Sequence, residues 1–232
     1  MRPAGLTFLT RTPRRSIHII RSTNMYPGTE IPRVGVFGGL GVGKSTLTMA
    51  FCQKHPDLTY EPTVEEDCFR TGFVLYGEEH LVEILDTAGQ EEFANMVDEW
   101  IQRCAGFILV FDLTSKSSFL CIDSLLERIL QVKRWTLEDP NRPDRLPIAI
   151  VANKTDLRHQ RVVSTKDGQD LGKKNNSLFF EASAKRNVYV YKVFHDVFAY
   201  LLLSSRQSFD DASSSGSGIS PTSTCVGCCT IM

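Results

Sequence analysis

The stretch Gly38-Gly39-Leu40-Gly41-Val42-Gly43-Lys44-Ser45 fits the pattern GxxxxGK[ST] of a phosphate-binding loop. An apolar run at 34–37 comes before it, and a helix-like segment begins at Thr46. In such a loop the glycines let backbone N–H groups turn towards phosphates, and the helix N-terminus adds a partial positive charge. Lys44 can reach the outer phosphates and Ser45 can ligate Mg²⁺. A glycine-rich turn can match this pattern by accident, so the motifs that follow decide its meaning.

The composition is that of one domain with flanking segments. The chain has 232 residues, and its 26 Lys and Arg residues nearly balance its 27 Asp and Glu residues, giving a formal net charge of −1. This balance offers no electrostatic argument for binding nucleic acid or for general adhesion to acidic membranes. No apolar run approaches the ~18 residues that a membrane-spanning helix needs, and the best run is 105–111.

Residues 1–28 differ from the rest of the chain in charge. They contain five Arg residues and no Asp or Glu, which leaves 21 basic and 27 acidic side chains in the remainder, about −6. The Arg-, Ser- and Thr-rich composition is similar to that of an organellar transit peptide. We favour a non-structural extension over such a signal. A start at Met25 is a further alternative, because the first predicted strand follows shortly after it.

Apolar strands alternate with amphipathic helices along the chain. The predicted strands are 33–37, 73–75, 81–85, 106–111, 148–152 and 178–181. The predicted helices are 45–53, with Leu47, Ala50 and Phe51 towards the core, 91–103, 118–135, with Leu125, Ile129 and Val132 towards the core, 165–174 and 188–203. The turn Tyr76-Gly77-Glu78-Glu79 predicts an antiparallel hairpin, and the unbroken apolar run 106–111 is typical of a buried parallel strand. The order predicts an α/β fold of the P-loop NTPase kind, a doubly wound, mostly parallel six-stranded sheet with one antiparallel strand and flanking helices.

Two polar motifs follow the ends of predicted strands. In Asp86-Thr87-Ala88-Gly89-Gln90, the carboxylate of Asp86 can hold Mg²⁺ through water and Gly89 lets its N–H approach the terminal phosphate, although Asp86 could also serve as a cap or turn residue. Asn153-Lys154-Thr155-Asp156 stands at the edge where α/β sheets bind ligands. A carboxylate there can accept two N–H groups from guanine, whereas adenine offers no such pair. The second motif therefore argues for a guanine base.

The chain from Ser204 onward is rich in Ser, Gly, Pro and Thr, which predicts a disordered tether over 204–232 after a domain at 29–203. It ends Cys229-Thr230-Ile231-Met232, a CaaX sequence whose last residue favours a farnesyl group on Cys229. One lipid anchors only weakly and no Lys or Arg follows Arg206, so we expect palmitoyl groups on Cys228, Cys225 or both. A redox or zinc pair is the alternative for these two cysteines, but no second ligand pair lies nearby.

Five segments in fixed order resemble the Ras superfamily of small GTPases. They are 38–45, Thr63, 86–90, 153–156 and 183–185, and the resemblance extends over about 32–203. Within the superfamily the chain is most similar to the Ras branch. Tyr60-Glu61-Pro62-Thr63 and residues 86–93 follow that branch closely, and the CaaX end differs from the double-cysteine end typical of Rab members.

This resemblance implies a site for GTP or GDP with Mg²⁺. Phosphates would be held by Gly38, Gly41, Val42, Gly43, Lys44, Ser45, Thr46 and Gly89. The metal would be held by Ser45, Thr63 and, through water, Asp86. Gln90 would orient the attacking water, with Lys44 as the second catalytic residue. Guanine would be held by Asn153, Lys154, Asp156, Ser183, Ala184 and Lys185. The switch that meets effectors would be Tyr60, Glu61, Pro62, Thr63, Val64, Glu65 and Glu66, and a second switch would follow at 89–93.

The chain departs from the Ras-branch pattern at three points. Pro56 stands where the family usually has an aromatic residue stacked on guanine. One extra residue lies in Val64-Glu65-Glu66-Asp67-Cys68, so effector contacts beyond Thr63 do not carry over one by one. Leu40 replaces a usual glycine in the phosphate loop. Leu40 favours slow hydrolysis of GTP.

The resemblance implies a switch that cycles between GTP and GDP in signal transduction. Its partners would be effector proteins, a guanine-nucleotide exchange factor and a GTPase-activating protein, with no nucleic acid. The alternative is an interaction module that stays loaded with GTP, and a P-loop kinase is disfavoured by the guanine motif. The lipidated end predicts the cytoplasmic face of the cell membrane, with the mitochondrion as the alternative that the N-terminal composition offers.

Overall fold

The computed structural model describes residues 31–52, 67–87, 96–137 and 146–214, and for 134–137 and 204–214 it describes the backbone only. The chain divides into two units, Met1–Glu30 and Ile31–Met232, and every described residue belongs to the second. The predicted extension at 1–28 therefore lies outside the described residues. Among the helices of the described part, none has the length and apolarity needed to cross a membrane.

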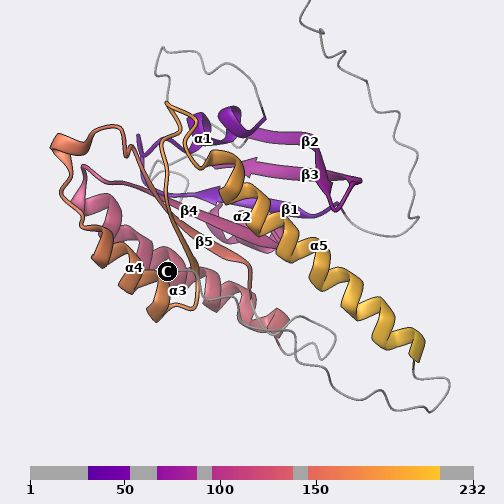
Figure 1. Cartoon of the computed structure of the whole chain (residues 1–232). Helices are drawn as coiled ribbons and strands as arrows, with labels where there is room; N and C mark the ends of the chain where they lie inside the picture. Colours follow the sequence, from indigo (N-terminus) through magenta and orange to yellow (C-terminus); the bar gives the residue numbers. More distant parts are fainter. Residues whose placement is uncertain (1–30, 53–66, 88–95, 138–145, 215–232) are drawn as a thin grey trace, which may run out of the picture. The chain divides into compact units, whose positions relative to one another are not determined.

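Six strands form one sheet in the order β2-β3-β1-β4-β5-β6 (Figure 1). They are β1 (Arg33–Phe37), β2 (Asp67–Leu75), β3 (Glu78–Asp86), β4 (Gly106–Asp112), β5 (Ile148–Asn153) and β6 (Leu178–Glu181). Only β2 pairs antiparallel, with β3, and the other neighbours are parallel. The predicted fold class is confirmed.

Helices cover both faces of the sheet. They are α1 (Lys44–Phe51), α2 (Val97–Arg103), α3 (Lys116–Leu137), α4 (Thr165–Lys174) and α5 (Val190–Ser214), with a 3-10 turn η2 (Arg158–Gln160). α1 and α5 pack on one face and share a hydrophobic core with β1, β3 and β4, in which Phe51 stacks on Phe194 with ring centroids 4.3 Å apart. α2, α3 and α4 supply the core on the other face. Every residue of β4 is buried between the two cores, which is why its sequence is apolar without alternation.

The β2–β3 hairpin is longer than the sequence indicated. Its turn is Tyr76-Gly77, with φ of 50° and 84°, the two positive values that a tight type I′ turn requires. Glu78 and Glu79 belong to β3, where they pair with Leu75 and Val74. Charged residues such as Arg70 made the rest of the hairpin resemble a loop in the sequence. In the structure, Arg70 lies opposite the buried Glu83 on β3 and donates to it from Nε at 2.7 Å.

Several helix ends also differ from the prediction. α3 runs from Lys116 to Leu137, two residues longer at each end than the predicted helix at 118–135. α5 begins at Val190, because Ser183 and Val188 pair in an isolated bridge just before it. It ends at Ser214, so the disordered tether expected from Ser204 is wrong for 204–214. These residues contain no Gly or Pro, and a helix already formed by packing extends at little cost. Of the helix predicted at 91–103, the described part is α2.

Helix α4 matches its predicted bounds, is capped at its start and packs closely on β6. Ser164 caps its start, accepting from the N–H of Asp167, whose carboxylate accepts in return from the N–H of Ser164. Gly168 and Gly172 face Phe179 on β6: a Cβ at Gly168 would lie 2.4 Å from the ring, and a Cβ at Gly172 would lie 3.1 Å from Cβ of Phe179. The absence of side chains at these two positions lets α4 approach the sheet closely.

Candidate functional site

The phosphate-loop motif connects β1 to α1 in the way that the sequence predicted. Gly38 has φ +149°, and a Cβ there would lie 2.2 Å from the carbonyl oxygen of Val110. Gly43 has φ +95°, a left-handed conformation just before the helix, and a Cβ there would lie 2.5 Å from Nδ2 of Asn153. Both positions require glycine for backbone conformation and for space. The loop therefore brings its backbone N–H groups to the start of α1, the geometry that binds anions.

Lys44, the first residue of α1, spans this loop. Its ammonium group donates to the carbonyl oxygens of Gly38 and Gly39, both at 3.0 Å. Burial lowers the pKa of Lys44 to about 8, although the nearby Asp86 carboxylate opposes the change. A buried cation whose hydrogen bonds go to neutral carbonyl oxygens gains stability when an anion approaches. Lys44 thus fits the role of a phosphate ligand.

Asp86 ends β3 and lies beside β1, paired with Val36. Burial raises the pKa of its carboxyl group to about 6, and Ser45 and Lys44 counter part of that rise. Neither carboxylate oxygen has a hydrogen-bond donor of good geometry, although both are buried. A buried carboxylate without such donors fits a divalent cation, because Mg²⁺ prefers oxygen ligands and its charge favours the ionised form. Ser45 and Asp86 can hold Mg²⁺ here.

Asn153 joins the phosphate loop to the loop after β6. Its side-chain Nδ2 donates to the carbonyl oxygen of Val42 at 2.8 Å, and its Oδ1 accepts from the N–H of Ala184 at 3.0 Å. Its side chain is buried. The structure thus brings together two segments that lie far apart in the sequence, and Asn153 does so by binding both of them.

Asp156 and Ser183 face each other at the carboxyl edge of the sheet. The hydroxyl of Ser183 donates to Oδ1 of Asp156 at 2.6 Å and accepts from the N–H of Arg186 at 3.1 Å. The N–H of Thr155 donates to the carbonyl oxygen of Ala182 at 3.1 Å, which joins the same two loops through the backbone. The contact with Ser183 holds the carboxylate that the sequence predicted to read guanine.

Lys154 has φ 67°, an uncommon value for a residue that is not glycine. Its ammonium group donates to Oδ2 of Asp112 at 2.7 Å and to the carbonyl oxygen of Gly41 at 2.8 Å. Lys154 therefore ties the base-binding motif to β4 and to the phosphate loop.

Asp112 is a site residue that the sequence reasoning missed. It also accepts from the backbone N–H and the hydroxyl of Thr114, both at 2.8 Å. Burial raises the pKa of the Asp112 carboxyl group, but the hydrogen bonds from Lys154 and Thr114 together outweigh burial and bring this pKa below its ordinary value. The signal that identified Asp86 and Asn153, a polar residue directly after a buried strand, was present here too. The predicted strand stopped at residue 111, and Asp112 received no role.

The remaining predicted residues divide into two groups. Thr46 lies in the first turn of α1, Lys185 is exposed after β6, and Leu40 is 56% exposed in the phosphate loop. The other predicted residues lie outside the described part of the chain, namely Gly89, Gln90, Pro56, Tyr60, Glu61, Pro62, Thr63, Val64, Glu65, Glu66, Cys225, Cys228 and Cys229.

Comparison with known proteins agrees with this geometry. The family model described as Ras family matches residues 33–202. Ras-like protein RAS2 of Hydra vulgaris is 43% identical over 162 residues, which cover 70% of this chain and 80% of that protein. Protein ras-2 of Neurospora crassa is 40% identical over 173 residues, covering 70% and 75%. Ras-like protein rasZ of Dictyostelium discoideum is 36% identical over 171 residues, covering 74% and 76%. The chain belongs to the Ras family of small GTPases, which bind GTP and GDP with Mg²⁺ and hydrolyse GTP as signalling switches.

Proposed function

We propose that this chain is a membrane-associated GTPase switch in which Leu40 slows hydrolysis and prolongs the GTP-bound state. The loop amides and Lys44 hold the phosphates, with Lys44 exchanging its carbonyl partners for phosphate oxygens. Ser45, Thr63 and Asp86 hold Mg²⁺, which neutralises charge on the phosphates when bound. Gln90 orients the attacking water, and the residues around Asn153 and Asp156 hold guanine.

The observation that carries the proposal is the position of Leu40. Its side chain is 56% exposed on the phosphate loop, between two glycines. In Ras-type enzymes an arginine from the activating protein contributes ~10³ to 10⁵ in rate, which corresponds to roughly 4 to 7 kcal/mol. That arginine and Gln90 must both approach this loop closely, where glycine would leave room. Four added carbons obstruct the approach, and electrostatic stabilisation is lost when its donors are displaced.

Nucleotide binding does not suffer from the same change. The contacts to phosphate come from backbone N–H groups and from Lys44, which donates into the loop from the α1 side. Leu40 extends into solvent and takes none of these contacts. We therefore expect GTP and GDP to bind normally while hydrolysis is slow and responds little to an activating protein.

Single-turnover hydrolysis of bound GTP tests the proposal. The rate is measured for the parent chain and for Leu40→Gly, each with and without a Ras-type activating protein. A large, activator-dependent gain in Leu40→Gly supports the proposal, and Leu40→Ala should lie between the two. Leu120→Ala is the matched control, because Leu120 is 59% exposed but belongs to α3 and not to the phosphate loop. Equal activator-stimulated rates in the parent and in Leu40→Gly would overturn the obstruction by Leu40.

A GTP-loaded interaction module with little hydrolysis is the second candidate, and the exposed Leu40 favours it as well. The same measurement separates the two functions. A slow but measurable intrinsic turnover in the parent indicates a switch, and its absence even at long times indicates the module.

The choice of base is tested by Asp156→Asn. The carboxylate of Asp156 is held by Ser183 and accepts two N–H groups from guanine in the proposed site. An amide accepts and donates instead, so the variant should bind GDP more weakly by a factor of ten or more and admit xanthosine diphosphate, at about 1–3 kcal/mol for each unpaired polar group. Equilibrium titration with both nucleotides and with ADP measures this. ADP binding as tight as GDP binding in the parent would contradict the guanine assignment.

A further inference from the structure

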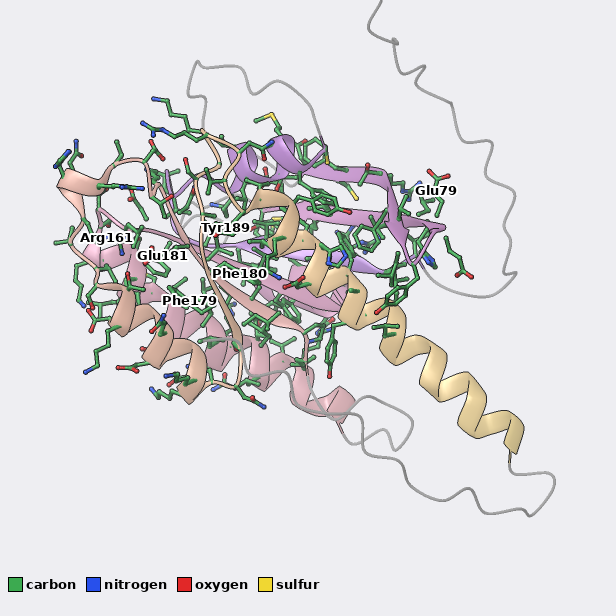
Figure 2. All side chains as sticks on the ribbon, viewed as in Figure 1. Glu79, Arg161, Phe179, Phe180, Glu181 and Tyr189 are labelled. Carbon is green, nitrogen blue, oxygen red and sulfur yellow. The ribbon has the colours of Figure 1, made fainter. Side chains whose placement is uncertain are left out.

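An ion pair lies next to the base-binding loops without belonging to them. The guanidinium group of Arg161 donates from Nη1 to Oε1 of Glu181 at 2.7 Å and from Nη2 to Oε2 at 2.9 Å. The hydroxyl of Thr165 donates to Oε1 of the same carboxylate at 2.7 Å. Figure 2 labels Arg161 and Glu181. We call Arg161, Thr165 and Glu181 the outer clamp.

The outer clamp joins three elements near the proposed guanine site. Arg161 follows η2 on the segment that leaves Asp156, Thr165 begins α4, and Glu181 ends β6 two residues before Ser183. The hydroxyl of Ser183 in turn donates to Asp156 at 2.6 Å. The two loops are therefore fastened twice, by the Asp156–Ser183 contact inside the site and by the outer clamp beyond it.

The geometry of the outer clamp makes it stronger than an ordinary surface pair. Two parallel N–H···O bonds hold the planar guanidinium group against the carboxylate, and such two-pronged pairs combine strength with fixed orientation. The side chains of Arg161 and Glu181 are only 28% and 26% exposed. The hydrogen bonds from Arg161 lower the pKa of the Glu181 carboxyl group by more than burial raises it, so this pKa lies below its ordinary value.

We propose that Arg161, Thr165 and Glu181 are positioning residues that hold the two guanine-binding loops together and thereby set the rate at which guanine nucleotide leaves. They act through Asp156 and Ser183 and do not touch the base. The inference rests on the proposed function, because it assumes that these loops hold guanine.

Arg161→Gln and Glu181→Gln test the outer clamp, because each removes one charge of the pair. Glu181→Gln also keeps the size of its side chain, whereas Arg161→Gln shortens it. We expect GDP to dissociate roughly five- to tenfold faster from each variant, the size of effect that a partly buried, charged hydrogen-bonded pair supports. The double variant should add little to either single variant, because one partner cannot act without the other. Arg161→Lys keeps the charge and loses the fork, so its rate should fall between those of the parent and Arg161→Gln.

Two readouts distinguish positioning from a general loss of stability. Single-turnover hydrolysis of GTP already bound should be unchanged, because that step takes place at the phosphates. Inosine diphosphate lacks the amino group that Asp156 would accept from, so the parent should release it faster than GDP, and this difference should shrink in Arg161→Gln. Arg128→Gln is the control, because it makes the same substitution at a different Arg–carboxylate pair, Arg128 Nε to Asp98 Oδ1 at 2.6 Å, between α3 and α2.

Unchanged GDP dissociation in Arg161→Gln and Glu181→Gln would overturn the outer clamp. An equal increase in the GDP dissociation rate of Arg128→Gln would also overturn it. So would a ratio of inosine diphosphate release to GDP release that is the same in Arg161→Gln as in the parent. A parent chain that binds no guanine nucleotide would overturn the proposed function itself, before any variant is compared. Thermal unfolding of each variant, measured in parallel, ensures that folded proteins are compared.

Discussion

At the scale of single residues, the site contains an acid whose ionisation opposes folding until a cation arrives. The pKa of Asp86 is about 6 in the folded protein without nucleotide, against an ordinary value of 3.8, because the carboxyl group is buried. The folded state therefore binds the proton more tightly than the unfolded chain does. The stability that this group contributes is present at low pH, falls as the pH rises from about 4 to about 6, and stays low above that. A difference of about two pKa units corresponds to roughly 3 kcal/mol.

Asp86→Asn should remove this dependence. We expect the metal-free, nucleotide-free variant to be more stable than the parent by about 1–3 kcal/mol at pH 7.5, because an amide carries no charge to bury. The variant should also lose the increase in nucleotide affinity that Mg²⁺ gives the parent. Urea unfolding at several pH values between 4 and 8 measures the first effect. The same pH slope in both proteins would mean that another group is responsible.

The placement of the phosphate and base motifs could be predicted because each motif lies at the end of a strand or in the loop that follows it. Lys44, Asp86 and Asn153 all stand at the carboxyl edge of a parallel sheet, where ligands bind. The link that Asn153 makes between Val42 and Ala184 could not be predicted, since it depends on how two distant loops meet. Asp112 was missed because the predicted strand stopped one residue before it, although its later partner Lys154 is also distant in the sequence. The outer clamp was missed because Arg161 and Glu181 meet only in the folded chain.

At the scale of elements, helix α4 depends on the two glycines that face Phe179. Gly168→Ala would place a methyl group 2.4 Å from the ring, which must then move. Alanine favours a helix over glycine by about 1 kcal/mol, whereas overpacking a core costs about 1–3 kcal/mol. We expect Gly168→Ala to lower the free energy of unfolding by up to about 2 kcal/mol, the difference between these two effects.

Chemical denaturation measures that change, and a second substitution identifies its cause. Phe179→Leu removes the ring atoms nearest to Gly168, so Gly168→Ala should cost less in that background. Gly172→Ala is the milder comparison, because its Cβ would lie 3.1 Å from Cβ of Phe179. A stabilising effect of Gly168→Ala in the parent would show that the helix can shift to accept the methyl group.

The type and order of the described elements could be read from the sequence, and their ends could not. Apolar runs identify β4 and β5. The spacing of Ile129 from the apolar residues one helical turn before and after it identifies α3. The hairpin strands were cut short because charged residues such as Arg70, Glu78 and Glu79 resemble a polar loop when strand pairing is unknown. α5 was cut short because serine is a poor helix former in isolation, whereas this helix is already fixed by the core around Phe194 and Phe198.

At the scale of the whole molecule, the chain combines a nucleotide-dependent domain with a proposed lipid attachment at Cys229. The 25 residues of α5 extend over about 37 Å at ~1.5 Å per residue, so the chain leaves the helix far from the loop at 183–185. The proposed lipid on Cys229 would be attached to the segment that follows this far end of α5.

Cys229→Ser tests the attachment. A farnesyl group at this position gives weak binding that a second lipid on Cys228 or Cys225 strengthens. We expect the variant to shift from the membrane fraction to the soluble fraction, with nucleotide binding unchanged. Cys225→Ser combined with Cys228→Ser keeps the first lipid and should shift only part of the protein. Fractionation and imaging of tagged chains measure both effects, and an unmoved Cys229→Ser variant would contradict the anchor.

The side chain of Asn153 has a consequence for the two halves of the ligand. It binds Val42 in the phosphate loop with one end of its amide and Ala184 in the base-binding loop with the other. Because one side chain joins the two loops, order in either loop favours order in the other. Guanosine and pyrophosphate, supplied as separate fragments, should therefore each raise the affinity of the site for the other, even though no covalent bond joins them. Two links therefore strengthen binding of the intact nucleotide: the covalent bonds between its base and its phosphates, and the Asn153 side chain between the two loops that hold them.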